Sequence, residues 1–155
     1  MRKLLLLITI VIIATGCDRQ KVFEQFYSIP GHKWASKEPV VFNVNIDDTA
    51  SSMNVMISIR NTGQYQFSNL YLFVTAFAPD GSQITDTTEI ILADTHGKWL
   101  GKGSAAVYTL YHPFRENIRF SRRGIYRFRL EQAMWVKELE HISDVGLRIE
   151  KTGSK

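Results

Sequence analysis

The stretch "PVVFNVNIDD", residues 39–48, decides the fold class because apolar and polar side chains alternate along it. Every second residue from Val40 to Ile46 is apolar, and the residues between them include two asparagines. Successive side chains of a β-strand point to opposite faces. The alternation therefore predicts a strand with one buried and one exposed face.

Related patterns predict further strands at residues 53–60, 69–78, 83–92, 106–111, 124–131 and 144–151. The segment 69–78 is apolar on both faces, so we expect a central strand that is covered on each side. The turn sequence "PDGS", residues 79–82, predicts that 83–92 returns antiparallel to it. We expect the first four strands of the chain to lie in hairpin order.

Little of the remaining sequence favours helix, apart from one or two turns expected at residues 134–142. The arginine-rich segment 114–124 is expected to be a solvated loop, with a membrane-surface or partner contact as the alternative. Many short strands with almost no helix predict an all-β protein, a single antiparallel β-sandwich of seven to eight strands. A barrel is the less favoured alternative.

The N-terminus has the three-part layout of a secretory signal peptide. Arg2 and Lys3 are followed by an apolar run over residues 4–14 and by small residues before Cys17. The run is shorter than the about 20 apolar residues that a membrane-spanning helix needs. The predicted organisation is a cleaved lipoprotein-type signal peptide at 1–16, a lipid anchor and tether at 17–21, a β-sandwich domain at 22–151 and a polar tail at 152–155.

Cys17 is the only cysteine in the chain, so the fold cannot depend on a disulfide. Ordinary signal removal would leave this residue as an unpaired thiol in an oxidising compartment. The segment "ATGC" resembles instead the lipobox of bacterial lipoproteins, although Ala14 stands where leucine is usual. This resemblance implies that Cys17 becomes the first residue and carries S-diacylglycerol and an N-acyl chain. Several acyl chains together hold a protein at a bilayer almost permanently.

The sequence offers little for catalysis or for metal and nucleic-acid binding. Without residues 1–16, which hold two of the 19 basic residues and none of the 15 acidic ones, the net charge is 17 − 15 = +2, far from the strongly basic balance of a nucleic-acid binder. The histidines lack metal-ligand spacing, so we expect no metal and no cofactor; they are His32, His96, His112 and His141. Asp86 and Glu89 would point to opposite faces of a strand, and Ser104 lacks a nucleophile-elbow sequence. We therefore expect that the protein is not an enzyme.

The loop "HGKWLGKG", residues 96–103, is the most specific local feature outside the signal peptide. Its glycines suggest backbone positions that need positive φ or close approach. Trp99, with Lys98 and Lys102 near it, could contact a glycan or a partner protein. The alternative, which the usual burial of tryptophan favours, is a core or rim aromatic under a long loop.

Several longer stretches resemble the GldH family of gliding-motility lipoproteins of the Bacteroidetes. They include "ISIRNTGQYQFSNLYLFV", "GKWLGKG" and "ISDVGLRIEK", and the resemblance spans roughly residues 17–151. Trp135 stands where the family usually has arginine. The resemblance implies a non-enzymatic lipoprotein of the cell envelope, at the outer membrane, that acts with other gliding-motility proteins linked to adhesin secretion. The alternative function is a surface carbohydrate-binding lipoprotein module that uses Trp99.

Overall fold

The computed structural model describes residues 19–104 and 106–153. The predicted signal peptide, residues 1–16, and Cys17 lie outside the described residues. Eight longer strands are present: β1 (Lys21–Ser28), β3 (Val40–Ile46), β4 (Met53–Thr62), β5 (Asn69–Phe77), β6 (Gln83–Ile91), β8 (Val107–Ile118), β9 (Gly124–Gln132) and β11 (Ile142–Lys151). Three short strands and a 3-10 turn complete this part of the chain: β2 (Lys33–Ala35), β7 (Lys102–Ser104), β10 (Glu138–Glu140) and η1 (Pro30–His32).

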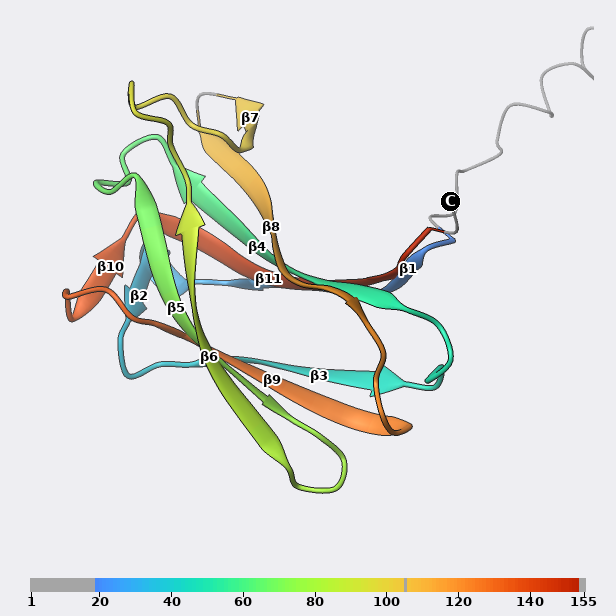
Figure 1. Ribbon diagram of the computed structural model, residues 1–155. Coiled ribbons are helices and arrows are strands. Elements are labelled where there is room, and N and C mark those ends of the chain that lie inside the picture. Colours follow the sequence, from blue (N-terminus) through green and yellow to red (C-terminus); the bar gives the residue numbers. More distant parts are fainter. Residues whose placement is uncertain (1–18, 105, 154–155) are drawn as a thin grey trace, which may run out of the picture.

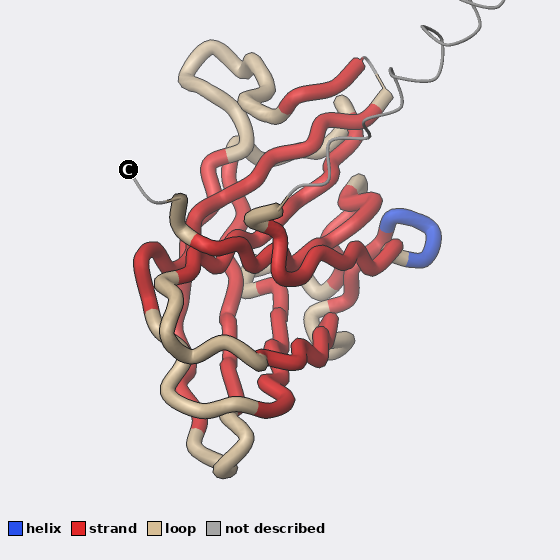
Figure 2. Tube along the Cα trace, turned by 90° about the vertical axis from the view of Figure 1, so that its right-hand side faces the viewer, coloured by secondary structure: helices blue, strands red, loops and turns tan. Residues whose placement is uncertain are grey.

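The strands form two main antiparallel sheets that pack face to face (Figure 1). One sheet has the order β1-β11-β4-β8-β7 and the other has the order β3-β9-β5-β6, while β10 and β2 form a separate pair. Figure 2 shows strands along most of the described part of the chain. The short helical turn drawn in blue is η1. The predicted all-β sandwich is confirmed, and the eight longer strands agree with the predicted seven to eight.

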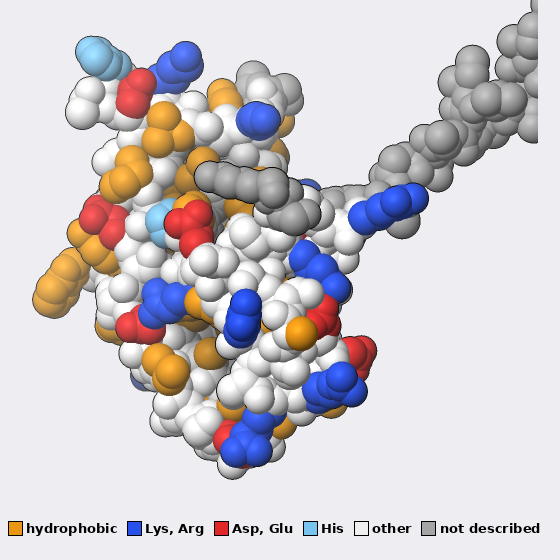
Figure 3. Space-filling view, turned by 45° about the vertical axis from the view of Figure 1, so that its right-hand side comes forward, with side chains coloured by type: hydrophobic (Ala, Val, Ile, Leu, Met, Phe, Trp, Pro, Cys, Tyr) orange, Lys and Arg blue, Asp and Glu red, His pale blue; other side chains and the backbone are white. Residues whose placement is uncertain are grey.

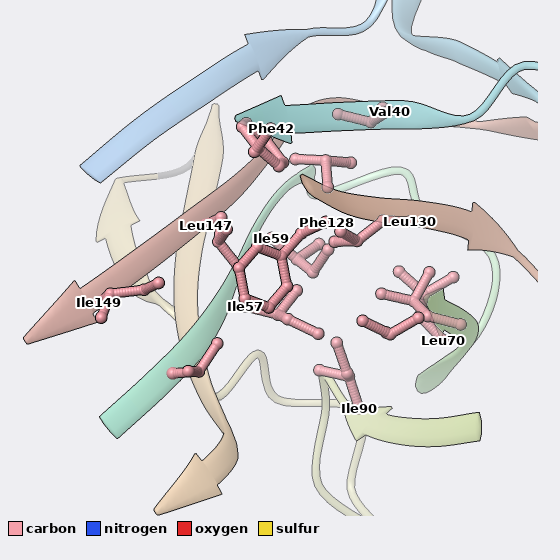
Figure 4. Close-up of a cluster of buried hydrophobic side chains, with 14 of the residues drawn as sticks. Val40, Phe42, Ile57, Ile59, Leu70, Ile90, Phe128, Leu130, Leu147 and Ile149 are labelled. Atoms are coloured by element: carbon pink, nitrogen blue, oxygen red, sulfur yellow. The ribbon is translucent and has the colours of Figure 1, made fainter. Parts of the chain in front are cut away.

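The core lies between the inner faces of the two main sheets (Figure 4). Alternation along β3 buries every second residue to 2% exposure or less, namely Val40, Phe42, Val44 and Ile46. Phe42 of this strand meets Phe23 of β1 from the opposite sheet, with ring centroids 6.4 Å apart in an edge-to-face arrangement. Such aromatic contacts add to the free energy of burying apolar area, so the alternating pattern stabilises the sandwich directly.

The predicted hairpin order of the first four strands is wrong. The segment 47–52 leads from β3 in one sheet to β4 in the other, and β3 pairs with the distant β9. β4 lies between β11 and β8. Only the β5–β6 hairpin, joined by the predicted turn at 79–82, agrees with that expectation. Local patterns reveal that a strand has a buried face but do not reveal its neighbours in the sheet.

Three local expectations also need correction. Strand β5 is covered on one face only, because Tyr71 and Phe73 are 38% and 46% exposed on the outer side. Residues 134–142 form no helix, since β10 within them pairs with β2 and buries Leu139. The segment 114–124 is not all loop, because β8 continues to Ile118 along β4.

Strand directions define two ends of the sandwich. β1 begins at the end that we call the N-terminal end, where residues 19–20 lie, and it runs toward the opposite end, the far end. The antiparallel pairings then assign the remaining connections. The N-terminal end holds segments 47–52, 78–82, 119–123 and 152–153. The far end holds segments 29–32, 63–68, 92–101 and 133–137.

Candidate functional site

An open cleft of about 740 Å³ lies at the far end of the described residues. Its volume lies within the roughly 300–1,000 Å³ of typical ligand pockets. The loops and strand ends that line it come from five separate regions of the sequence. The lining residues are Gly31, His32, Lys33, Thr62, Gly63, Gln64, Trp99, Ala106, Tyr108, Glu140 and His141.

One wall of the cleft is aromatic. The Trp99 ring lies with its centroid 5.9 Å from that of Tyr108 and 6.3 Å from that of Tyr65. Tyr65 is buried behind the wall, where its hydroxyl donates a hydrogen bond to the Asn69 carbonyl oxygen at 2.9 Å. Burial raises the pKa of the Tyr65 phenol above its ordinary value. Trp99 itself is partly buried and packs against the core, so it is a rim aromatic.

The glycines of the 96–103 loop bring this wall close to β8. A Cβ atom on Gly103 would lie 2.0 Å from the Val107 carbonyl oxygen, and one on Gly101 would lie 3.0 Å from the Thr109 carbonyl carbon. Gly97 has a φ of +78°, which side chains disfavour. Both reasons expected for these glycines, positive φ and close approach, are therefore present in the loop.

The opposite wall is polar and comes from the β2–β10 pair. The Lys33 Nζ lies 2.9 Å from a carboxylate oxygen of Glu140 and 3.4 Å from one of Glu138. Hydrogen bonds and charge from these two carboxylates raise the pKa of Lys33, and Lys33 lowers the pKa of Glu140 in return. Lys33 and Glu140, the two residues of this wall with opposite charges that line the cleft, neutralise each other, which suits a ligand that is itself uncharged.

Two histidines lie side by side at the junction of this wall. The His141 backbone N–H donates a hydrogen bond of 2.7 Å to the His32 carbonyl oxygen. Both residues have positive φ, 58° for His32 and 69° for His141. Such left-handed backbone is uncommon outside glycine, although histidine tolerates it better than most residues. Strained conformations of this kind concentrate at binding and catalytic sites.

The structure separates the site residues that the sequence singled out. Trp99 lines the cleft, whereas Lys98 and Lys102 are exposed and do not line it. Sequence reasoning missed the wall of Lys33 and Glu140, because β2 and β10 are more than 100 residues apart in the chain. Neither three-residue strand carries a sequence pattern that predicts its pairing with the other strand.

The other candidate constellations do not assemble into a site. Asp86 pairs with Arg115 of the opposite sheet, while Glu89 accepts a 2.6 Å hydrogen bond from Asn69 on the outer face. The two carboxylates point to opposite faces, as predicted. Across residues 19–104 and 106–153, no three histidine, cysteine or acidic side chains gather closely enough to hold a metal ion. No helix in the same residues is long and apolar enough to cross a membrane.

Two of the motifs that carry the family resemblance meet at the cleft. "RNTGQY", residues 60–65, supplies Thr62 and Gln64 to the lining and places Tyr65 behind Trp99. "GKWLGKG", residues 97–103, supplies Trp99 itself. Trp135 lies at the same end but outside the cleft, with its side chain fully exposed.

Comparison with known proteins identifies close relatives over nearly the whole chain. A protein of Christiangramia forsetii named "Gliding motility lipoprotein GldH homolog" is 34% identical over 149 residues, which cover 92% of this chain and 91% of the relative. "Gliding motility lipoprotein GldH" of Flavobacterium johnsoniae is 29% identical over 153 residues, which cover 94% of each chain.

Solved structures resemble this fold only weakly. The structure of the infectious bursal disease virus Gx strain gives a TM-score of 0.35 at 14% identity, covering 93% of this chain and 37% of the viral chain. Latent PorU from Porphyromonas gingivalis gives 0.32 at 8% identity, covering 85% of this chain and 13% of that chain. Scores this low support no argument about fold or function. The family model described as GldH lipoprotein, by contrast, matches residues 21–149. The chain belongs to the GldH lipoprotein family.

Proposed function

We propose that this protein is a lipid-anchored, non-enzymatic component of the bacterial gliding machinery, held at the outer membrane by acyl chains on Cys17. The observation that carries the proposal is the combination of family membership with a single cysteine just ahead of the first strand. Relatives of 34% and 29% identity are named gliding motility lipoproteins. With other gliding-motility envelope proteins as partners, its contribution is placement at the membrane and not catalysis.

The spacing between the cysteine and the fold supports an anchoring role. Cys17 precedes Lys21, the first residue of β1, by four residues. A fully extended link of this length reaches at most about 14 Å. Each methylene buried in the bilayer contributes about 0.8 kcal/mol, so diacylglycerol with an additional N-acyl chain anchors stably whereas one chain does not. The domain would therefore sit close to the lipid headgroups.

The experiment that tests this proposal replaces Cys17 with serine in the native organism. We expect the Cys17→Ser protein to lose labelling by an alkyne analogue of palmitate, to leave the membrane fraction and to abolish spreading on agar. Gln25→Ser, an exposed position of β1, is the matched control and should change none of these. Normal spreading by cells that lack the protein entirely would refute the motility role.

The cleft at the far end favours carbohydrate binding as a second candidate function. An aromatic wall of Trp99 and Tyr108 faces a polar wall whose two oppositely charged lining residues neutralise each other, a combination suited to a neutral sugar. Trp99→Ala should abolish binding to any glycan that the protein recognises on an array. Trp135→Ala removes an exposed tryptophan at the same end but outside the cleft, so it should leave binding intact. An array without signal for the unsubstituted protein removes this candidate.

A further inference from the structure

A second hollow, of about 340 Å³, opens between the two sheets at the N-terminal end. It is lined by residues of β6 and β8, which belong to opposite sheets, and we call it the slot. Most of its lining atoms belong to apolar side chains from both sheets. Its apolar lining residues are Val55, Val74, Ala76, Ala78, Ile84, Phe114, Ile118, Phe120, Tyr126 and Phe128.

The slot leads from solvent into the core. Val74 and Val55, each 1% exposed, form its floor, while Ile84 at its mouth is 69% exposed. Phe120 and Tyr126 pack edge to face along one side, with ring centroids 4.8 Å apart. An apolar opening of this form leaves core side chains within reach of any apolar group that can enter.

The backbone of β8 is irregular beside the slot. The pairing of β4 with β8 shifts register on both sides of Val55, where β8 reaches Arg115. Asn117, one residue before the last of this strand, has a φ of 55°. Register shifts of this kind bend a strand away from its sheet. The irregular end of β8 contributes Phe114, Arg115 and Ile118 to the lining of the slot.

Arginine side chains border the mouth of the slot. Arg115 reaches across from β8 to pair with Asp86 of β6, so its charge is neutralised. Arg119 also lines the slot and forms no ion pair with another described residue. Figure 3 shows Lys and Arg side chains, with Asp and Glu side chains among them, on the face that this view presents. An uncompensated guanidinium beside an apolar opening matches a phosphate group attached to a hydrocarbon chain.

The position of the slot at the N-terminal end favours the membrane as the source of such a ligand. Its lining residues come from the parts of β4, β5, β6, β8 and β9 nearest the N-terminal end. β1 begins at that same end, and a link of four residues between Cys17 and Lys21 spans at most about 14 Å. Acyl chains on this cysteine would hold the mouth of the slot against the bilayer. This step rests on the proposed function.

We propose that the slot takes up one acyl chain of an anionic membrane phospholipid, with Arg119 binding the phosphate. The chain would fill the space above Val74 and contact Ile84 at the mouth. Such a contact adds a second attachment beside the covalent anchor. It fixes the rotation of the sandwich on the membrane, which a flexible tether alone does not.

A tryptophan reporter in the slot tests the proposal. All three native tryptophans, Trp34, Trp99 and Trp135, lie toward the far end. Phe120→Trp places a further one in the slot lining. The full lipid-anchored protein is reconstituted in nanodiscs of phosphatidylcholine and phosphatidylglycerol, with or without bromine on the phosphatidylglycerol acyl chains. We expect brominated lipid to quench the emission added by Phe120→Trp and to leave the emission of the unsubstituted protein unchanged.

Two further pairs of variants separate insertion from general proximity. Ala76→Phe fills the slot and should abolish quenching of the reporter, whereas Thr87→Phe, on the outer face of β6, should not. Arg119→Glu should reduce quenching by brominated phosphatidylglycerol, whereas Arg123→Glu, outside the slot, should have little effect. Equal losses for the two arginine variants would indicate general charge attraction and overturn the phosphate assignment.

Other outcomes also decide against the proposal. If brominated lipid does not quench the emission of a folded Phe120→Trp protein, the proposal is overturned. If, in addition, Ala76→Phe abolishes gliding, the slot binds a protein segment and not a lipid. If the reporter variant does not fold, a second assay measures by mass spectrometry the phospholipid that the unsubstituted protein retains after exchange into detergent. We expect Ala76→Phe to lose that lipid. Retention of the lipid by folded Ala76→Phe refutes the proposal. The nanodisc assay reads lipid insertion independently of motility, so its failure differs from failure of the gliding role.

Discussion

Replacing either of two buried serines in neighbouring strands with alanine should change the stability of the fold, with opposite sign at the two positions. Ser58 in β4 is 1% exposed, and its hydroxyl has no hydrogen-bond partner among the described residues. Ser143 in β11 is 7% exposed, and its hydroxyl lies 2.9 Å from Asp144 Oδ2 and 3.2 Å from the Arg60 carbonyl oxygen. Either oxygen can accept its proton. The same substitution, serine to alanine, therefore removes an unsatisfied group at one position and a hydrogen bond at the other.

We expect Ser58→Ala to raise the free energy of unfolding by about 1 kcal/mol, because the desolvation cost of the hydroxyl disappears. Ser143→Ala should lower it by about 1 kcal/mol through the lost hydrogen bond. The difference of about 2 kcal/mol corresponds to a factor of roughly 30 in the folding equilibrium. Urea unfolding followed by tryptophan fluorescence measures it as a shift in midpoint at constant m-value. Destabilisation by Ser58→Ala equal to that by Ser143→Ala would refute the reasoning.

Three other perturbations have defined outcomes. Burial lowers the pKa of His112 below 6.5, so the folded protein binds a proton at this residue less readily than the unfolded chain does. The free energy of unfolding should therefore fall as the pH drops below about 6.5. His112→Gln should make the free energy of unfolding less dependent on pH, measured by urea titrations from about pH 8 to 5. A Cβ on Gly146 would lie 2.8 Å from the Phe26 ring, so Gly146→Ala should lower the unfolding midpoint, at a cost of about 1–3 kcal/mol. Lys33→Gln should raise the Glu140 pKa, measured by NMR titration, with little change in stability.

The sequence predicted the strands well because burial of one face is a local property. The alternation from Val40 to Ile46 gives the burial of β3 residue by residue. The partners of β3 are not local, since Val40 pairs with Leu130 across most of the chain. The choice between neighbours depends on how two entire sheets pack, which no short window of sequence contains.

The candidate cleft could be predicted only on its aromatic side. Trp99 is recognisable because glycines surround it in one short loop. The polar side exists because Leu139 and Trp34 bury their side chains on paired three-residue strands, and that pairing brings Lys33 to Glu140. Strands this short carry too little pattern for detection, and the helix-like spacing of 134–142 predicted the wrong element.

The direction of the strands determines which end of the molecule would face the bilayer if Cys17 carried a lipid anchor. β4 runs ten residues from the N-terminal end to the far end, a span of roughly 30 Å. An anchor within about 14 Å of β1 would hold the slot against the headgroups. It would also carry the cleft with Trp99 well beyond them, toward soluble or surface partners. The same antiparallel pairing that stabilises the sandwich places the slot and the cleft at opposite ends, so an anchor that brought the slot to the membrane would hold the cleft away from it.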